Sequence, residues 1–192
     1  FFNKIFCKSF FRLPKLLNLF LIFFSGFEYL FTLEKIYFVE QPYLGINNNK
    51  KYFVFLFNIF TELFRRLDED NSLLHSVSFI LLLIFTGARK SELARTTWDD
   101  WYGDYIELKE HKTDKDGKIR KIWLNSQSRS VIQALQGEKK KKTILGIKNP
   151  KRLWNSVKLA CNCKDLRLHD LRHSFGTIST NAANIQTLQT GE

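Results

Sequence analysis

The chain has 192 residues, 44% of them hydrophobic, so it can form a folded core, and wholesale disorder is excluded. Its formal net charge of +11 favours a polyanionic partner, either nucleic acid or an anionic membrane surface. The three cysteines, Cys7, Cys161 and Cys163, form no disulfide framework and fit a reducing cytosol.

The positive charge is concentrated in the second half of the chain. Residues 1–85 contain 9 Lys or Arg and 7 Asp or Glu, whereas residues 86–192 contain 21 and 12. An anion-binding site is therefore expected after residue 85. The sequence contains no methionine, not even at position 1, which indicates a fragment or a mistranslated upstream segment.

The first 64 residues are rich in phenylalanine and imitate a targeting or membrane segment. Four basic residues precede a mostly apolar run, Leu16–Phe31, as in a signal peptide or an anchor. The longest uninterrupted apolar piece, Leu19–Phe24, is far shorter than the roughly 20 residues that a membrane span needs. A buried helix is therefore preferred to a membrane anchor.

The pattern predicts a loop or linker at Gln41–Asn49, with a domain boundary there, and a short helix over Thr61–Leu67. A polar break at Asp68–Ser72 precedes the next helix. In that helix one face is expected to pack inward, and Thr86–Gly87 ends it. The inward residues are Leu73, Val77, Ile80, Leu81 and Ile84. Thr86 is expected to cap a following helix over residues 88–96.

Two strands, Tyr105–Lys109 and Ile119–Leu124, are predicted to form a hairpin, with Asp116–Gly117 as its turn. Three more helices are predicted, over Ser126–Leu135, Pro150–Ala160 and Asp170–Thr180. The expected fold is mainly α with a small antiparallel β-sheet, an α+β class.

Two short segments contain residues suited to phosphate chemistry. In Thr86–Leu93, Arg89 is expected at the start of a helix, where backbone N–H groups and the helix dipole favour a phosphate, and Glu92 one turn on can hold it. In Leu168–Phe175, His169 and Arg172 are three apart, so on a helix they share a face. Each segment alone is more often an ordinary surface feature.

Lys112, on the predicted hairpin, completes the set, because a lysine beside a phosphate can protonate a leaving oxygen. In order and spacing the three segments resemble the two arginine boxes and the lysine-bearing hairpin of tyrosine recombinases, the phage integrase family. The resemblance covers roughly residues 51–190. It implies the DNA breaking-rejoining enzyme fold, with residues 57–192 as an incomplete catalytic domain and residues 47–56 as a linker. Residues 1–46 resemble a remnant of the helical, SAM-like core-binding domain, in which residues 1–12 match nothing.

The resemblance implies site-specific DNA recombination or integration by strand cleavage and rejoining through a 3′-phosphotyrosyl intermediate. Arg89 and Arg172 would stabilise charge on the phosphate, Lys112 would protonate the 5′-oxygen, and His169 would transfer protons. Glu92 and His173 would support them, and further DNA contacts are expected from Lys90, Lys115, Lys118 and Arg120. The implied partner is double-stranded DNA, bound by a homotetramer on two duplexes. No cofactor or metal is expected, and the implied location is the cytoplasm, on the nucleoid.

The sequence departs from that family where the nucleophile is expected. No tyrosine follows Tyr105, so the chain is expected to be truncated and unable to cleave DNA alone. The alternatives are a non-catalytic DNA-binding remnant of a mobile element, a type IB topoisomerase-like enzyme and a membrane-anchored protein. Zinc binding by Cys161, Cys163 and the nearby histidines is disfavoured, because Cys-x-Cys is not the usual spacing.

Overall fold

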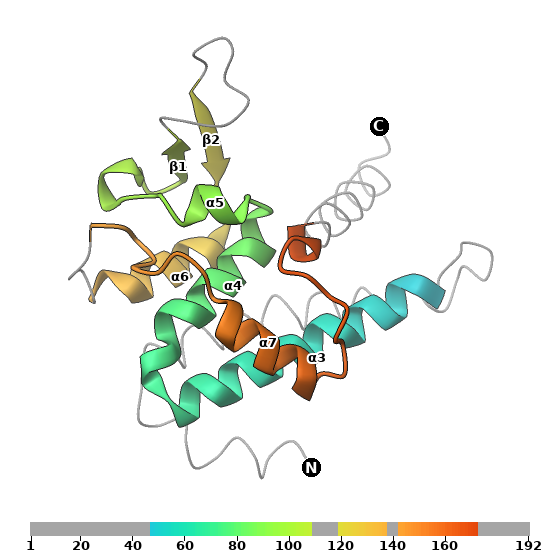
Figure 1. Ribbon diagram of the computed structural model, residues 1–192. Coiled ribbons are helices and arrows are strands. Elements are labelled where there is room, and N and C mark those ends of the chain that lie inside the picture. The colour runs from blue at the N-terminus through green and yellow to red at the C-terminus, as the bar shows by residue number, and fades with distance from the viewer. Residues whose placement is uncertain (1–46, 109–118, 138–141, 173–192) are drawn as a thin grey trace, which may run out of the picture. The chain divides into compact units, whose positions relative to one another are not determined.

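A computed structural model of the protein describes residues 47–108, 119–137 and 142–172 (Figure 1). The chain forms two compact units, residues 1–71 and residues 72–192, which are described separately. The described elements are helices with one two-stranded antiparallel sheet, which confirms the predicted fold class.

In the first unit the described element is the helix α3, Asn47–Glu69. Its buried residues recur every three or four positions, as on one face of an amphipathic helix. They are Leu56, Ile59, Phe60, Leu63, Phe64 and Leu67. On its polar side, Glu62 accepts hydrogen bonds from Arg65 and Arg66. Helix α3 ends at Glu69, within the predicted polar break at Asp68–Ser72, although Asp68 and Glu69 still belong to the helix.

Helix α3 is much longer than the predicted Thr61–Leu67, so that prediction was too short. It includes Asn47–Asn49, which were expected in a loop, and residues 47–56, which were expected to be a linker. An asparagine inside a helix costs only a fraction of a kcal/mol, about 0.7 at most, so it does not stop a helix whose apolar face continues beyond it. The assignment of domains stays a prediction, and residues 1–46 lie outside the described residues.

In the second unit the central element is α4, Leu74–Thr86, which follows a short 3-10 turn, η2, at Asn71–Leu73. Helix α4 packs against three others: α5 (Lys90–Leu93), α6 (Ser126–Gln136) and α7 (Lys151–Ala160). Every residue from Val77 to Ile84 is buried, so this part of the helix faces the core on all sides. The sequence predicted burial on one face alone, and that prediction was wrong.

Helix α4 ends where the sequence predicted, at the Thr86–Gly87 step. Gly87 has a positive φ of 60° and its N–H donates to the carbonyl of Leu83 at 3.1 Å. Glycine suits this left-handed conformation because it has no Cβ to clash with the backbone. The chain therefore leaves α4 sharply and delivers Arg89 two residues later.

The sheet consists of β1, Tyr105–Leu108, and β2, Arg120–Trp123, paired antiparallel with Ile106 opposite Ile122. Both isoleucines are buried, whereas Tyr105 and Trp123 lie on the outer side, with their rings 5.4 Å apart. The two predicted strands are confirmed. The hairpin turn between them lies outside the described residues.

Helices α6 and α7 also match their predictions to within a residue at each end. The side chain of Asn125 caps α6 by accepting the N–H of Ser128 at 2.8 Å. Pro150 precedes the first residue of α7, where a missing N–H costs nothing. Trp154 of α7 is only 2% exposed and belongs to the core.

None of the helices in the described ranges is both long enough and apolar enough to cross a membrane.

Candidate active site

Arg89 lies immediately before α5 in an extended conformation, with φ −73° and ψ 143°. The first box was predicted to form a helix over residues 88–96 capped by Thr86, but α5 comprises only four residues. Thr86 instead donates its hydroxyl to the Leu82 carbonyl at 2.6 Å and accepts the N–H of Ala88 at 3.2 Å. Its side chain is therefore committed to the end of α4, and a different side chain caps α5.

That capping side chain is Glu92, whose carboxylate is 4% exposed. Its Oε2 accepts the backbone N–H of Arg89 at 2.7 Å, and its Oε1 accepts Nη1 of the Arg89 side chain at 3.1 Å. The predicted contact between Arg89 and Glu92 is thus present. A carboxylate that binds both the backbone and the guanidinium of one arginine fixes the direction of that side chain.

Glu92 also binds Arg120, which enters the site from β2. Nη1 of Arg120 donates to the same Oε1 atom at 2.9 Å. The side chains of Arg89 and Arg120 are 39% and 32% exposed, so both guanidiniums also meet solvent. One buried carboxylate therefore joins α5 to the sheet. We call Arg89, Glu92 and Arg120 the arginine–glutamate cluster.

The second arginine box, Leu168–Phe175, is connected to α7 through the segment that precedes the box. The indole Nε1 of Trp154 donates to the carbonyl of Leu166 at 3.3 Å. The carboxylate of Asp170 accepts the backbone N–H of Arg167 at 2.8 Å and its guanidinium at 3.0 Å. This pair closes the turn from which a helical segment starts at Asp170.

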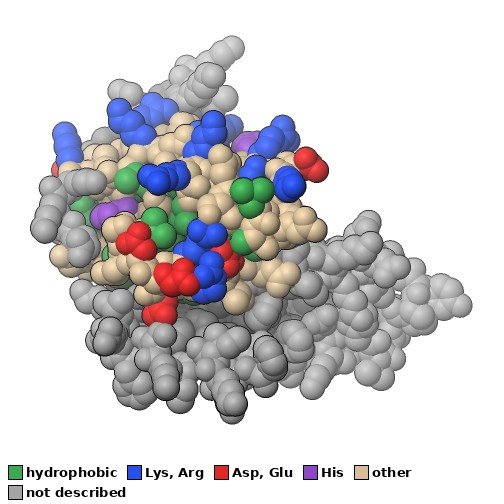
Figure 2. All heavy atoms as spheres, turned by 60° about the horizontal axis from the view of Figure 1, so that its bottom comes forward, with side chains coloured by type: hydrophobic (Ala, Val, Ile, Leu, Met, Phe, Trp, Pro, Cys, Tyr) green, Lys and Arg blue, Asp and Glu red, His purple; other side chains and the backbone are tan. Residues whose placement is uncertain are grey.

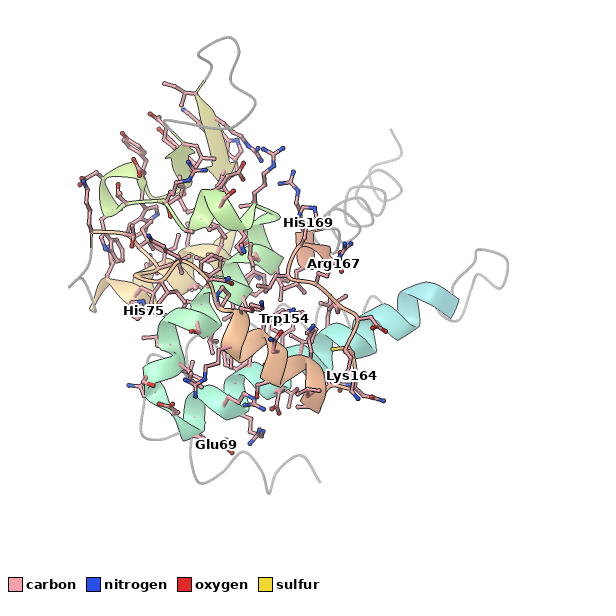
Figure 3. All side chains as sticks on the ribbon, in the orientation of Figure 1. Glu69, His75, Trp154, Lys164, Arg167 and His169 are labelled. Atoms are coloured by element: carbon pink, nitrogen blue, oxygen red, sulfur yellow. The ribbon has the colours of Figure 1, made fainter. Side chains whose placement is uncertain are left out.

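His169 is exposed and lies before that helical segment, not within it. Figure 3 shows it on the turn drawn to the right of α5 in that view. Its carbonyl accepts the N–H of Arg172 at 3.1 Å. The helix start predicted at Asp170, directly after His169, is therefore confirmed, and the shared face of His169 and Arg172 stays a prediction. The predicted helix beyond residue 172 lies outside the described residues.

Arg172 is half-buried, and its Nη1 atom is shielded from solvent without a hydrogen-bond partner in the described part of the chain. A buried N–H donor that is left unsatisfied costs about 1–3 kcal/mol, and more when the group is charged, so such donors usually have a partner. Leu171 beside it is fully buried, which anchors the backbone at this point. An incoming anion oxygen would satisfy the orphaned donor.

Several predicted site residues lie outside the described residues: Lys112, Lys115, Lys118 and His173. Lys90 is described and is exposed at the start of α5, where it can meet an anion. Figure 2 shows Lys and Arg side chains gathered along the upper rim of the described surface in that view. Within the described ranges, no three His, Cys, Asp or Glu side chains gather closely enough to hold a metal ion.

The sequence reasoning missed two features here. The first is the link between Arg120 and Glu92, which are 28 residues apart in the chain. The second is an exposed aromatic group in which Tyr102 stacks on Tyr105 at 5.2 Å and Tyr105 contacts Trp123. Lys121 lies 4.2 Å above the Tyr105 ring. Alternation along β2, which puts Lys121 and Trp123 on one face, was the signal for the second feature.

Comparison with known proteins agrees with the motifs. The phage integrase family matches residues 60–190, more than half of the chain. The chain therefore belongs to the phage integrase family, as the sequence predicted.

Two solved structures match part of the chain, each at 17% identity with a TM-score of 0.40. One is a lambda integrase tetramer bound to a Holliday junction, and the match covers 60% of this chain and 39% of that one. The other is a lambda integrase dimer bound to a COC′ core site, with 61% and 48% covered. This chain thus spans less than half the length of either. No curated protein sequence matches significantly.

Proposed function

We propose that this chain contributes the phosphate-binding machinery of a site-specific DNA recombinase, which cuts and rejoins DNA strands through a 3′-phosphotyrosyl intermediate. The observation that carries the proposal is that both arginine boxes have guanidinium donors to spare. The two arginines of the arginine–glutamate cluster share one carboxylate, and Nη1 of Arg172 has no partner among the described residues. Within a chain of the phage integrase family, both arginine boxes thus present positive charge for a phosphate.

In the proposed reaction, the guanidiniums of Arg89 and Arg172 bind the non-bridging oxygens of the scissile phosphate. They stabilise the extra negative charge of the pentavalent transition state, as preorganised donors do in other sites. Lys112 donates a proton to the departing 5′-oxygen, and His169 assists proton transfer at the same phosphate. The exposed position of His169 suits a group that must meet DNA.

The nucleophile is proposed to lie outside these 192 residues, because no tyrosine follows Tyr105. The chain alone should then bind DNA without forming a covalent bond to it. Its partner is double-stranded DNA, and the active species is a homotetramer on two duplexes. Residues 57–192 would be the catalytic domain, residues 47–56 the linker and residues 1–46 part of a core-binding domain.

The first test is binding of the purified chain to a random-sequence DNA duplex at several salt concentrations. Affinity should fall steeply as salt rises, because phosphate neutralisation releases counterions. Arg89→Gln and Arg172→Gln should each weaken binding by about tenfold and flatten the salt dependence by about one unit of slope. Arg95→Gln and Arg152→Gln are the controls, because both arginines are exposed and lie outside the two boxes, Arg95 two residues after the first box and Arg152 on α7. Equal losses in all four variants would refute a specific role for the boxes.

The second test addresses cleavage. A nicked DNA substrate that traps phosphotyrosyl adducts should yield no adduct with the 192-residue chain. An adduct would overturn the proposed place of the nucleophile. In a separate step, the DNA downstream of this reading frame is sequenced, and any segment there that encodes a tyrosine is joined to the chain. Adducts from that longer protein would establish the recombinase, whereas their absence would favour a non-catalytic DNA-binding protein.

A further inference from the structure

We infer that Arg120 is a positioning residue that keeps the first arginine box both oriented and positively charged. The inference rests on the proposed function and deepens it. It concerns a residue that the sequence pattern placed only among general DNA contacts.

The geometry of the arginine–glutamate cluster is the starting point. Oε1 of Glu92 receives Nη1 of Arg89 at 3.1 Å and Nη1 of Arg120 at 2.9 Å, and Oε2 receives the backbone N–H of Arg89 at 2.7 Å. The Glu92 side chain is 4% exposed, so the carboxylate forms few hydrogen bonds with solvent. Arg120 therefore supplies part of the hydrogen bonding that a buried carboxylate requires.

The charge of the cluster is the second step. Arg89 and Glu92 alone would cancel and leave Lys90 to supply the positive charge of the first box. With Arg120 bound to the same oxygen, the cluster keeps one net positive charge. A guanidinium has several N–H donors, so one bond to Glu92 leaves others on Arg89 for a phosphate.

The fold explains why this arginine comes from β2. In the sheet register Arg120 lies opposite Leu108, which is buried, so its side chain is on the inner side of the hairpin. Its neighbour Lys121 lies on the outer side, over Tyr105. Arg120 thus ties the hairpin to the short α5, which as a four-residue helix has little stability of its own.

A double-mutant cycle on DNA binding tests the inference, with the full 192-residue chain and a random-sequence duplex at fixed salt. Arg120→Gln should weaken binding about tenfold when Arg89 is present, because both its charge and its positioning of Arg89 are lost, and by about threefold in the Arg89→Gln background, where only its charge is lost. Arg120→Lys should restore most of the affinity, because it keeps the charge and a donor. The matched control cycle pairs Arg89→Gln with Arg95→Gln, and its two effects should multiply.

A direct phosphate contact by Arg120 would give the same fold loss with and without Arg89, and that result would overturn the inference while leaving the proposed function standing. No loss with Arg120→Gln would also overturn it. If the unmodified chain shows no salt-dependent binding, the proposed function fails and the inference fails with it. Urea unfolding of every variant ensures that affinities are compared between folded proteins. If Arg120→Gln does not fold, the cycle is run with Arg120→Lys, for which little loss in either Arg89 background is the expected result and equal losses of more than about threefold in both overturn the inference.

Discussion

Replacing Glu92 by glutamine tests how much the arginine–glutamate cluster stabilises the second unit. The amide keeps one acceptor oxygen but places an NH₂ group where the carboxylate accepted a donor, among three hydrogen bonds at 2.7, 3.1 and 2.9 Å. Breaking a fully buried ion pair costs about 3–5 kcal/mol. The two guanidiniums are 39% and 32% exposed, so solvent recovers part of that cost. We therefore expect a loss of about 2 kcal/mol.

The measurement is urea unfolding followed by circular dichroism, with the midpoint of thermal unfolding as a second readout. A loss of that size should lower Tm by roughly 6–8 °C for a unit of this length. Glu107→Gln on β1 is the control, because the same change there removes no ion pair that the structure records and should cost less than about 0.5 kcal/mol. If Glu92→Gln and Glu107→Gln lose equal stability, the three hydrogen bonds do not stabilise the fold as argued.

Hydrogen bonding to Arg65, reinforced by Arg66, lowers the pKa of Glu62 below its ordinary 4.5, so its stabilising effect is present at neutral pH and disappears as the pH falls through the lowered value. The difference in Tm between the unmodified chain and Glu62→Gln should accordingly be constant near pH 7 and vanish in strong acid. Trp154→Phe removes the bond to the Leu166 carbonyl, so it should cost about 1–2 kcal/mol in urea unfolding and speed amide hydrogen exchange around the second box. The same change at the exposed Trp123 should cost less than about 0.5 kcal/mol. Burial raises the pKa of the Cys163 thiol, so iodoacetamide should label Cys163 more slowly in the folded chain than in urea at pH 7.5, as peptide mass spectrometry can measure.

Most elements of the second unit could be predicted because their signals are local. The two strands pair where alternation placed them, and α6 and α7 begin at the capping residues Asn125 and Pro150. The end of α4 followed from Gly87, whose positive φ only glycine adopts without strain. In each case a few neighbouring residues decide the backbone conformation, so the printed sequence was sufficient.

The misses have two sources: local alternatives that residue types alone do not decide, and one contact between residues far apart in the chain. Helix α3 begins with three asparagines, because the small free-energy penalty of each is outweighed by the apolar face that follows. Thr86 has the right chemistry for a cap but bonds backward to Leu82. Glu92 was expected to hold Arg89 because the two are three residues apart, a local signal. Its second partner, Arg120, comes from another element and could not be inferred from spacing.

A site for phosphate must solve two problems that oppose each other. Guanidiniums need carboxylates to fix their direction, yet each carboxylate cancels one positive charge. On α3 the ion pairs are balanced: Arg65 and Arg66 meet Glu62, and Arg65 also meets Glu69. In the first box two arginines share a single buried carboxylate, and in the second box Nη1 of Arg172 meets none that the structure describes. The excess of guanidinium over carboxylate, more than the presence of arginine itself, separates the two boxes from an ordinary ion-paired helix surface and supports the proposal that a phosphate binds there.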